Sequence, residues 1–399
     1  MSVISKETQR LLATGSTLRD MFEEGKRLAK QYGRENIYDF SLGNPNTPVP
    51  EELNDAIRQV LDEYDSLTLH GYMSNPGFED TRQAIADNLN ERFGTNFAGK
   101  NICMTVGAAN ALVIAFKILL DPGDEVAVFA PFFLEYRNYI SNFGGVTTVV
   151  PPNPPTFMPD MDALRNTITE KTKAIVINNP NNPTGVVYDE QTIRNIAAVL
   201  EECQEKYGHP IFLVSDEPYR ELIYDGLEYP FLTKYYANTM ICYSFSKCLS
   251  IPGERIGYLL VPDEAAESQD ILASTANAIR AVGCVNAPSL QQKAIMKVLN
   301  ARSDTHIYDR NRQLLVSILH EAGFEVANPQ GAFYVFVKTP IPDDKEFVAY
   351  AKDNYRIIIS SGAAFDCPGY IRMAYCVEYA MIEKAKDSII KLGKDYGLN

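Results

Sequence analysis

Two ionisable side chains, an amine and a carboxylate, each end an apolar run that is typical of a buried strand. Lys247 ends the run that starts at Met240, and Asp216 ends the run that starts at Ile211. The carboxyl ends of strands in an open parallel sheet line one crevice, so we expect both side chains to face the same pocket. A lysine can form a Schiff base with an aldehyde, and a carboxylate can pair with a pyridine nitrogen. Together they point to pyridoxal 5'-phosphate (PLP), although either residue alone also fits a solvated strand end or a helix cap.

Six further residues have the types and positions that bind a phosphate group. They are Gly107, Ala108, Ala109, Ser244, Ser246 and Arg255. The first three lie where a predicted strand passes into a predicted helix, and free amides and the helix dipole attract anions at such a point. The two serines are two positions apart in an extended segment, so their hydroxyls point to one side. The arginine can bind phosphate oxygens with two hydrogen bonds, although a tight turn and a surface ion pair also explain these residues when each is taken alone.

The composition argues against several classes of protein. The chain has 399 residues, 46% of them hydrophobic and 22% charged, which is enough for two domains with apolar cores. A formal net charge of -14 argues against nucleic acid and anionic membranes as partners. The four histidines and seven cysteines show neither metal-ligand spacing nor a CxxC pair, so we expect no metal site. No apolar signal core and no membrane-length apolar run occur, so we expect a cytoplasmic protein.

Strand-like and helix-like segments alternate through the middle of the chain. Strands are predicted at 102–106, 125–130, 146–150, 174–178, 211–216, 240–247 and 258–261. Helices are predicted at 79–93, 108–120, 160–169 and 190–207. This alternation predicts an α/β fold in which helices cover a mostly parallel sheet.

The last part of the chain has a different pattern. One long helical pattern covers 290–323, an alternating strand follows at 333–337, and a final helix is predicted at 378–392. These elements predict a smaller α+β domain, with which the N-terminal segment packs. The expected organisation is an N-terminal arm at 1–47, a large PLP-binding domain at 48–290 and a small C-terminal domain at 291–399.

Four short motifs resemble those of a known enzyme family. They are Asn-Asn-Pro-Asn-Asn-Pro-Thr-Gly at 178–185, Ser-Asp-Glu-Pro-Tyr at 215–219, Ser-Phe-Ser-Lys at 244–247 with Gly-Glu-Arg-Ile-Gly at 253–257, and Gly-Ala-Phe-Tyr at 331–334. In their order and spacing the sequence resembles the class I/II aminotransferases, PLP-dependent enzymes of fold type I that include aspartate aminotransferase. The resemblance covers nearly the whole chain and implies an aminotransferase with PLP as its cofactor.

The resemblance implies a role for each residue around the cofactor ring. Lys247 would hold the cofactor as a Schiff base and transfer the substrate proton, and Asp216 would pair with the pyridine nitrogen. Asn182 and Tyr219 would hydrogen-bond the phenolic oxygen, although the Asn-rich segment alone also fits an ordinary turn. Phe133 would stack on the ring, where related proteins often have Tyr or Trp. The implied catalytic set is Lys247, Asp216 and Tyr219.

The resemblance also implies contacts to the phosphate and to the substrate. The six phosphate residues named above would hold the phosphate, joined by Tyr72 from the neighbouring subunit. The active sites would therefore be shared within a homodimer. Arg372 would bind the α-carboxylate of the substrate, while Gly43 and Asn182 would also contact the substrate.

These roles predict a transaminase that moves an amino group from an L-amino acid to a 2-oxo acid by a ping-pong mechanism. Aspartate and 2-oxoglutarate are the first expectation, with alanine and aromatic amino acids as alternatives. Arg280 lies close to where one aspartate aminotransferase subgroup has an arginine for the distal carboxylate, but it also fits a solvated helix. A C–S lyase or another eliminating enzyme of the same fold is the alternative reaction. A PLP-binding transcriptional regulator would need an extra DNA-binding domain, and a general nucleotide-binding protein would need phosphate-loop motifs that this sequence lacks.

Overall fold

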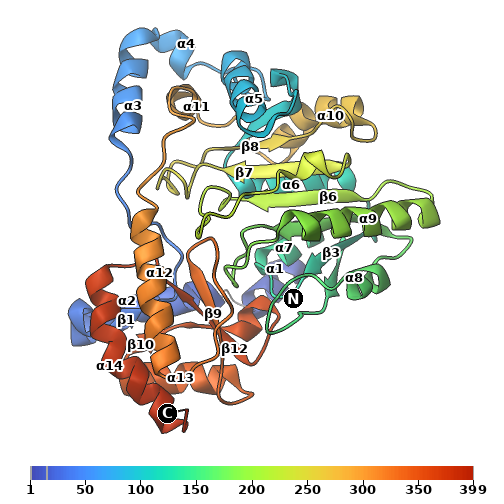
Figure 1. The fold of residues 1–399 in the computed structure, drawn as a ribbon. Coiled ribbons are helices and arrows are strands. Elements are labelled where there is room, and N and C mark those ends of the chain that lie inside the picture. Colours follow the sequence, from blue (N-terminus) through green and yellow to red (C-terminus); the bar gives the residue numbers. More distant parts are fainter. Residues whose placement is uncertain (1, 15–16, 399) are drawn as a thin grey trace. The chain divides into compact units, whose positions relative to one another are not determined.

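The computed structural model describes residues 2–14 and 17–398 and divides the chain into two compact units (Figure 1). The larger unit consists of Pro45–Ile307 and Asn328–Ala332. The smaller unit consists of Met1–Asn44, Tyr308–Ala327 and Phe333–Asn399. The smaller unit thus contains both ends of the chain. The boundary between the larger unit and the C-terminal part of the smaller unit falls at 307–308, where the sequence predicted 290–291.

A seven-stranded sheet forms the centre of the larger unit, in the order β2-β8-β7-β6-β5-β3-β4. Its strands are β2 (Ile102–Thr105), β3 (Glu125–Phe129), β4 (Val146–Val150), β5 (Thr172–Asn178), β6 (Phe212–Glu217), β7 (Thr239–Ser244) and β8 (Gly257–Leu260). Neighbours from β7 across to β4 pair in parallel, whereas β8 runs antiparallel to both β7 and β2. The predicted α/β class with a mostly parallel sheet is therefore confirmed.

Helices cover both faces of this sheet because its strands are apolar on both faces. The helices of the larger unit include α3 (Glu51–Glu63), α4 (Ser66–His70), α5 (Glu79–Phe93), α6 (Ala108–Leu119), α7 (Glu135–Ser141), α8 (Met161–Thr167), α9 (Glu190–Tyr207), α10 (Ser268–Ala281) and α11 (Ser289–Met296), with short 3-10 turns at Gly99–Asn101 and Leu232–Lys234. On β7, Met240 and Cys242 join a core cluster with residues of α6, whereas Ile241 and Tyr243 join a cluster with residues of α5 and α11. Figure 1 shows α9 in front of the sheet and α6 behind it.

The helix predicted to run without a break over 290–323 is wrong. The chain forms α11 and, from His306 to Glu321, α12, and the residues between them are not helical. In this gap Arg302 Nη1 donates to the backbone carbonyls of Leu299 at 2.8 Å and Ala301 at 2.7 Å, and the Asp304 carboxylate accepts the amide proton of His306 at 3.0 Å. These side-chain contacts compete with helical hydrogen bonds, and the spacing of apolar residues carries no sign of them. Since α11 packs on α3 and α5, it belongs to the larger unit, which moves the boundary.

The smaller unit combines two short sheets with helices. β11 (Ser360–Ser361), β12 (Tyr370–Ala374) and β9 (Tyr334–Lys338) form an antiparallel sheet, and β1 (Tyr38–Asp39) pairs in parallel with β10 (Ile357–Ile358). Its helices include α1 (Lys6–Thr14), α2 (Thr17–Tyr32), α12, α13 (Asp344–Tyr355) and α14 (Tyr379–Asp395), with 3-10 turns at Arg34–Asn36 and Gly362–Phe365. The β1–β10 pairing joins the N-terminal segment to the C-terminal part of the chain within this unit.

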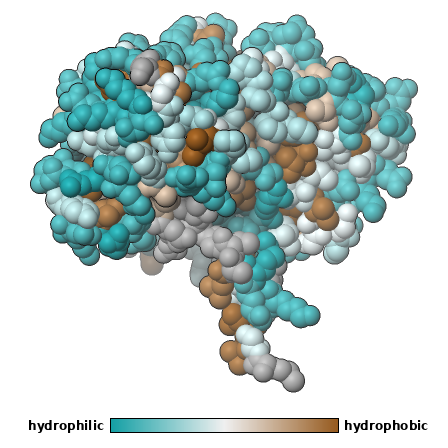
Figure 2. Space-filling view, turned by 90° about the horizontal axis from the view of Figure 1, so that it is seen from below, coloured by the Kyte–Doolittle hydropathy of each residue, from teal (hydrophilic) through white to brown (hydrophobic). Residues whose placement is uncertain are grey.

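The surface carries mostly hydrophilic residues on the face that Figure 2 shows, with hydrophobic residues scattered among them. Within the described ranges 2–14 and 17–398, no helix is long and apolar enough to span a bilayer. The same residues contain no group of three or more His, Cys, Asp or Glu side chains arranged to hold a metal ion.

Candidate active site

A buried carboxylate lies at the carboxyl end of β6, in the middle of the parallel part of the sheet. Asp216 is 6% exposed, and its Oδ2 accepts a hydrogen bond of 2.6 Å from the Tyr136 hydroxyl. Burial raises the pKa of Asp216 to about 7, and the Tyr136 hydrogen bond opposes this rise. Because a neutral hydroxyl, rather than a cation, holds this carboxylate, its negative charge would be strongly stabilised by a cationic ligand.

Tyr136 is a candidate site residue that the sequence did not indicate. It lies on α7 and is 1% exposed, and its ring makes an edge contact with Phe133 at 5.8 Å between centroids. Burial raises the pKa of Tyr136 well above its ordinary value, and Asp216 and Tyr219 add to the rise, so the hydroxyl remains a proton donor. The spacing of three residues between Phe133 and Tyr136 gave a weak signal that both lie on one side of a helical turn. Nothing in the sequence paired Tyr136 with Asp216.

Asn182 and Asp216 are linked through one side chain. The Asn178 amide donates to the backbone carbonyl of Asp216 at 2.9 Å, and its Oδ1 accepts the backbone amide proton of Asn182 at 2.7 Å. Asn178 and Asp216 lie directly opposite each other on β5 and β6. Tyr219 follows β6 and is 5% exposed. The residues predicted to contact the pyridine nitrogen and the phenolic oxygen thus come from neighbouring strand ends.

Arg255 connects the candidate phosphate residues to one another. Its Nη1 donates to Ser246 Oγ at 3.4 Å and its Nη2 donates to the Val106 carbonyl at 3.0 Å. Ser244 Oγ in turn donates to Ser246 Oγ at 2.8 Å. Arg255 has a φ of 54°, a left-handed conformation that these contacts must hold in place. The guanidinium and both hydroxyls therefore converge beside the end of β2.

Gly107 completes this candidate phosphate cradle at the N-terminus of α6. Its φ is 81°, and a Cβ at this position would lie 2.6 Å from Arg255 Nη2. The first backbone amides of a helix have no partner within the helix. The amides of Ala108 and Ala109 therefore face the cradle at the N-terminus of α6. Ala108 is buried and Ala109 is half-buried. A guanidinium, two hydroxyls and helix amides are the donor set that suits a phosphate dianion, so these residues fit the phosphate group of PLP.

Lys247 lies in a turn rather than in the strand that the sequence predicted. β7 ends at Ser244, and residues 245–249 form turns. The strand is shorter because the Ser246 carbonyl accepts the amide proton of Ile251, which folds the backbone back on itself. Lys247 is half-buried there. Since β6 and β7 are parallel neighbours, Lys247 and Asp216 still lie at the same end of the sheet, where both strands have their carboxyl ends.

Two predicted residues of the larger unit are exposed. Tyr72 follows α4 with 95% of its surface accessible, and Leu67 on the same helix is 88% exposed. Arg280 is exposed in the last turn of α10. The roles predicted for Tyr72 and Arg280 therefore stay predictions, because the surface of a single chain does not test them.

The two candidate substrate residues of the smaller unit meet at one aromatic ring. Arg372 on β12 is 3% exposed, and its guanidinium lies 4.4 Å from the centroid of Tyr334 and 4.7 Å from that of Phe365. Its Nη2 donates to the Ser41 carbonyl at 2.5 Å. A Cβ on Gly43 would overlap the Tyr334 hydroxyl at 1.8 Å. Stacking and the bond to Ser41 hold the guanidinium in a fixed plane, as bidentate binding of a carboxylate requires.

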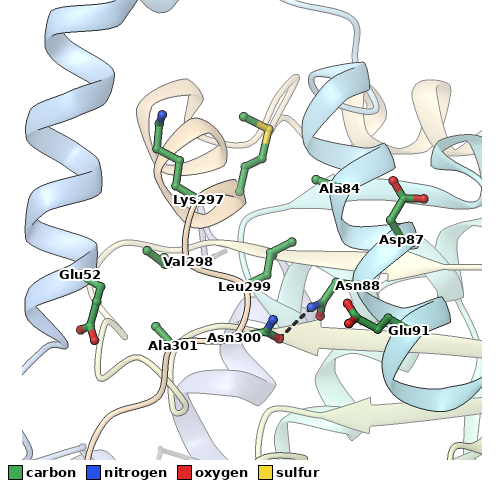
Figure 3. A pocket seen from close by; sticks show the side chains of 11 residues that line it. Glu52, Ala84, Asp87, Asn88, Glu91, Lys297, Val298, Leu299, Asn300 and Ala301 are labelled. Carbon is green, nitrogen blue, oxygen red and sulfur yellow. Dashed lines mark hydrogen bonds between the residues drawn. The ribbon is translucent and has the colours of Figure 1, made fainter.

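A pocket of about 660 Å³ in the larger unit is lined by residues of α3, α5 and α11 and of the segment that follows α11 (Figure 3). Its lining includes Glu52, Asp87, Glu91 and Lys297, and an Asn88 amide that bonds to Asn300 at 2.8 Å. The described residues that line it include none of the predicted site. Three carboxylates against one amine would repel an anion, so this pocket does not suit a dicarboxylic oxo acid such as 2-oxoglutarate.

Comparison with known proteins identifies the family. The family model for aminotransferase class I and II matches residues 35–389. The chain belongs to this family. It is 31% identical over 356 residues to a probable aspartate/prephenate aminotransferase of Thermus aquaticus, covering 87% of this chain and 88% of the relative. The predicted enzyme class, a transaminase, is therefore confirmed.

Two solved structures resemble the chain over nearly its full length. An amino transferase from Eubacterium rectale has 44% sequence identity and a TM-score of 0.97, with 100% of both chains covered. An aspartate aminotransferase from Thermus thermophilus, solved with maleate, has 26% identity and a TM-score of 0.86, covering 98% of this chain and 100% of that chain. The fold class predicted from the sequence agrees with both.

Proposed function

We propose that this aminotransferase uses PLP to move an amino group between aspartate and 2-oxoglutarate. The buried Asp216 carboxylate carries the proposal, because it is held by a hydroxyl and lies in the unit that also contains the phosphate cradle. The pyridine nitrogen and the phosphate of PLP would occupy these two places. Bound PLP supplies an electron-poor ring that stabilises negative charge on the substrate Cα.

The residues of the larger unit would bind the cofactor and move the proton. Asp216 would accept the pyridine N–H, and Arg255 with the two serines would hold the phosphate. Asn182 and Tyr219 would hydrogen-bond the phenolic oxygen. In its neutral form the Lys247 amine would take the proton from the substrate Cα.

Arg372 would orient the substrate through its α-carboxylate. The bond to Ser41 uses one nitrogen of the guanidinium, and the aromatic rings of Tyr334 and Phe365 fix its plane. A carboxylate bound in this way has one defined orientation, and alignment of the Cα–H bond contributes to the rate.

Aspartate is the preferred substrate in this proposal because of the relatives' names. The Thermus relatives are described as acting on aspartate or prephenate, and one was solved with the dicarboxylate maleate. Arg280 is the candidate for the distal carboxylate, and the exposed Tyr72 would contact the phosphate in a second copy of the chain. A homodimer with shared active sites is therefore part of the proposal.

The decisive experiment is labelling of the protein after reconstitution with PLP. Borohydride reduction followed by peptide mapping should place one pyridoxyl group on Lys247, and Lys247→Ala should lose at least about three orders of magnitude in transamination rate. Colourless protein in excess PLP, or a variant with near wild-type activity, would refute the proposal. A panel of amino donors with 2-oxoglutarate then ranks aspartate against alanine and aromatic amino acids.

A further inference from the structure

We propose that Asn178 is a positioning residue that sets the distance between the two protein contacts of the cofactor ring. The proposal rests on the proposed function, since it requires that Asp216 and Asn182 both contact PLP. Asn178 itself would not touch the cofactor. It would act by joining the backbone of Asn182 to that of Asp216.

The geometry of this link is specific to an asparagine. Asn178 is 6% exposed, and its side chain donates from Nδ2 to the Asp216 carbonyl at 2.9 Å while Oδ1 accepts from the Asn182 amide at 2.7 Å. One donor and one acceptor on the same short, planar group are both used. Aspartate lacks the donor, and leucine has the same shape with neither group.

The position of Asn178 explains why such a link is needed. It is the last residue of β5, opposite Asp216 in the register of the parallel pair, so it is fixed by the sheet. Beyond it the chain leaves the sheet and turns, and the Gly185 amide bonds back to the Asn181 carbonyl. Asn182 lies in that turn, outside the strand pairing. The Asn178 side chain therefore fixes the backbone of Asn182, a loop residue, relative to the strands of the sheet.

The neighbouring residue provides a matched control. Asn179 is completely buried, and its side chain also makes one donor and one acceptor bond to a backbone, from Nδ2 to the Tyr188 carbonyl at 3.2 Å and from the Tyr188 amide to Oδ1 at 2.9 Å. Like Asn178, it is a buried asparagine whose side chain makes two bonds to the backbone. Its bonding partner, however, is not a candidate cofactor ligand.

The experiment compares Asn178→Leu with Asn179→Leu as apoenzymes and after addition of PLP. Equilibrium dialysis gives the PLP dissociation constant, thermal unfolding of the apoenzyme gives the structural cost, and a pH titration of the visible absorption of bound PLP reports the environment of its ring. We expect Asn178→Leu to raise the dissociation constant about tenfold or more and to shift the titration midpoint, as loss of a supporting contact does at other sites. Asn179→Leu should lower the thermal midpoint similarly and change the dissociation constant less than about threefold.

Three results would overturn the inference. One is a PLP affinity and titration midpoint in Asn178→Leu that match the wild type, and another is an equal loss of affinity in both leucine variants. If the wild-type protein binds no PLP, the proposed function fails as well, and this outcome is distinct from the first two. Should either leucine variant fail to fold, Asn178→Asp and Asn179→Asp make the same comparison, because each removes the donor and keeps the acceptor.

Discussion

Replacing Tyr136 by phenylalanine tests whether Asp216 is tuned to receive a cation. The Tyr136 hydroxyl donates to Asp216 at 2.6 Å, and both residues are buried. A hydrogen bond to a charged group contributes about 1.5–3 kcal/mol, and Tyr136→Phe removes this stabilisation from the carboxylate form alone. The pKa of Asp216, which burial already raises to about 7, would rise further because the hydrogen bond that opposes burial is lost.

The consequence is a change in the pH dependence of PLP binding. Pairing with the pyridine N–H requires the carboxylate form, so wild-type affinity should increase with pH up to the Asp216 pKa of about 7 and then level off. In Tyr136→Phe the increase should continue to higher pH. At pH 7 the variant's dissociation constant should be about tenfold higher or more, and the difference should shrink toward pH 9.

Tyr236→Phe is the control for the loss of a buried hydroxyl. Tyr236 is 4% exposed and donates to the Ile211 carbonyl at 2.6 Å, just before the opposite end of β6. It should lower the free energy of unfolding without changing the pH profile of binding. If the binding profile of Tyr136→Phe, measured by equilibrium dialysis from pH 6 to 9, superimposes on that of the wild type, the argument that Tyr136 holds Asp216 ionised is wrong.

Two further substitutions test the phosphate cradle and the substrate arginine. Gly107→Ala adds a Cβ that would clash with Arg255, so we expect weaker PLP binding. Gly283 has a similar φ of 82° but open space around it, so Gly283→Ala should lower only the free energy of unfolding, by about 1–2 kcal/mol. Equal effects of both on PLP affinity would contradict the cradle. Arg372→Lys should raise the KM for the amino donor about 10- to 100-fold because a bidentate contact is lost. Arg310→Lys, which loses a similar ring contact at 4.3 Å, should leave the KM unchanged, and steady-state kinetics separates the two outcomes.

The sheet and its helices were predictable because local signals fixed their limits. The helices predicted at 79–93 and 190–207 have the bounds of α5 and α9, and each ends at a glycine with positive φ, Gly94 at 65° and Gly208 at 74°. Glycine adopts this conformation without the steric cost that a Cβ adds, so it is a local signal for the end of a helix. The apolar strands were equally clear, since burial on both faces leaves a continuous hydrophobic run.

Contacts between distant residues were not predictable from the same patterns. Tyr136 donates to Asp216 across 80 positions of the chain, and Arg302, near the helix break, forms an ion pair with the distant Glu221. Neither contact changes the spacing of apolar residues, which is the signal that sequence patterns supply. The end of β7 was missed for a related reason, because Phe245 continues the apolar run beyond Ser244, where the strand ends.

The two adjacent carboxylates of β6 show what the fold adds to the sequence. Side chains alternate along a strand, so Asp216 and Glu217 point to opposite faces of the sheet. Glu217 is completely buried and forms an ion pair of 2.5 Å with Arg220, and it also accepts a bond of 2.7 Å from Ser215. Its charge is therefore already compensated by the protein.

Asp216 has a different environment although it is also buried. Its carboxylate is held by a neutral hydroxyl, and burial raises its pKa to about 7, so ionising it costs free energy in the isolated protein. A cation that arrives with a ligand would recover this cost, whereas at Glu217 it would find a charge already paired. The sequence places two acids side by side, and the alternation of the strand makes one of them structural and leaves the other available to a pyridinium.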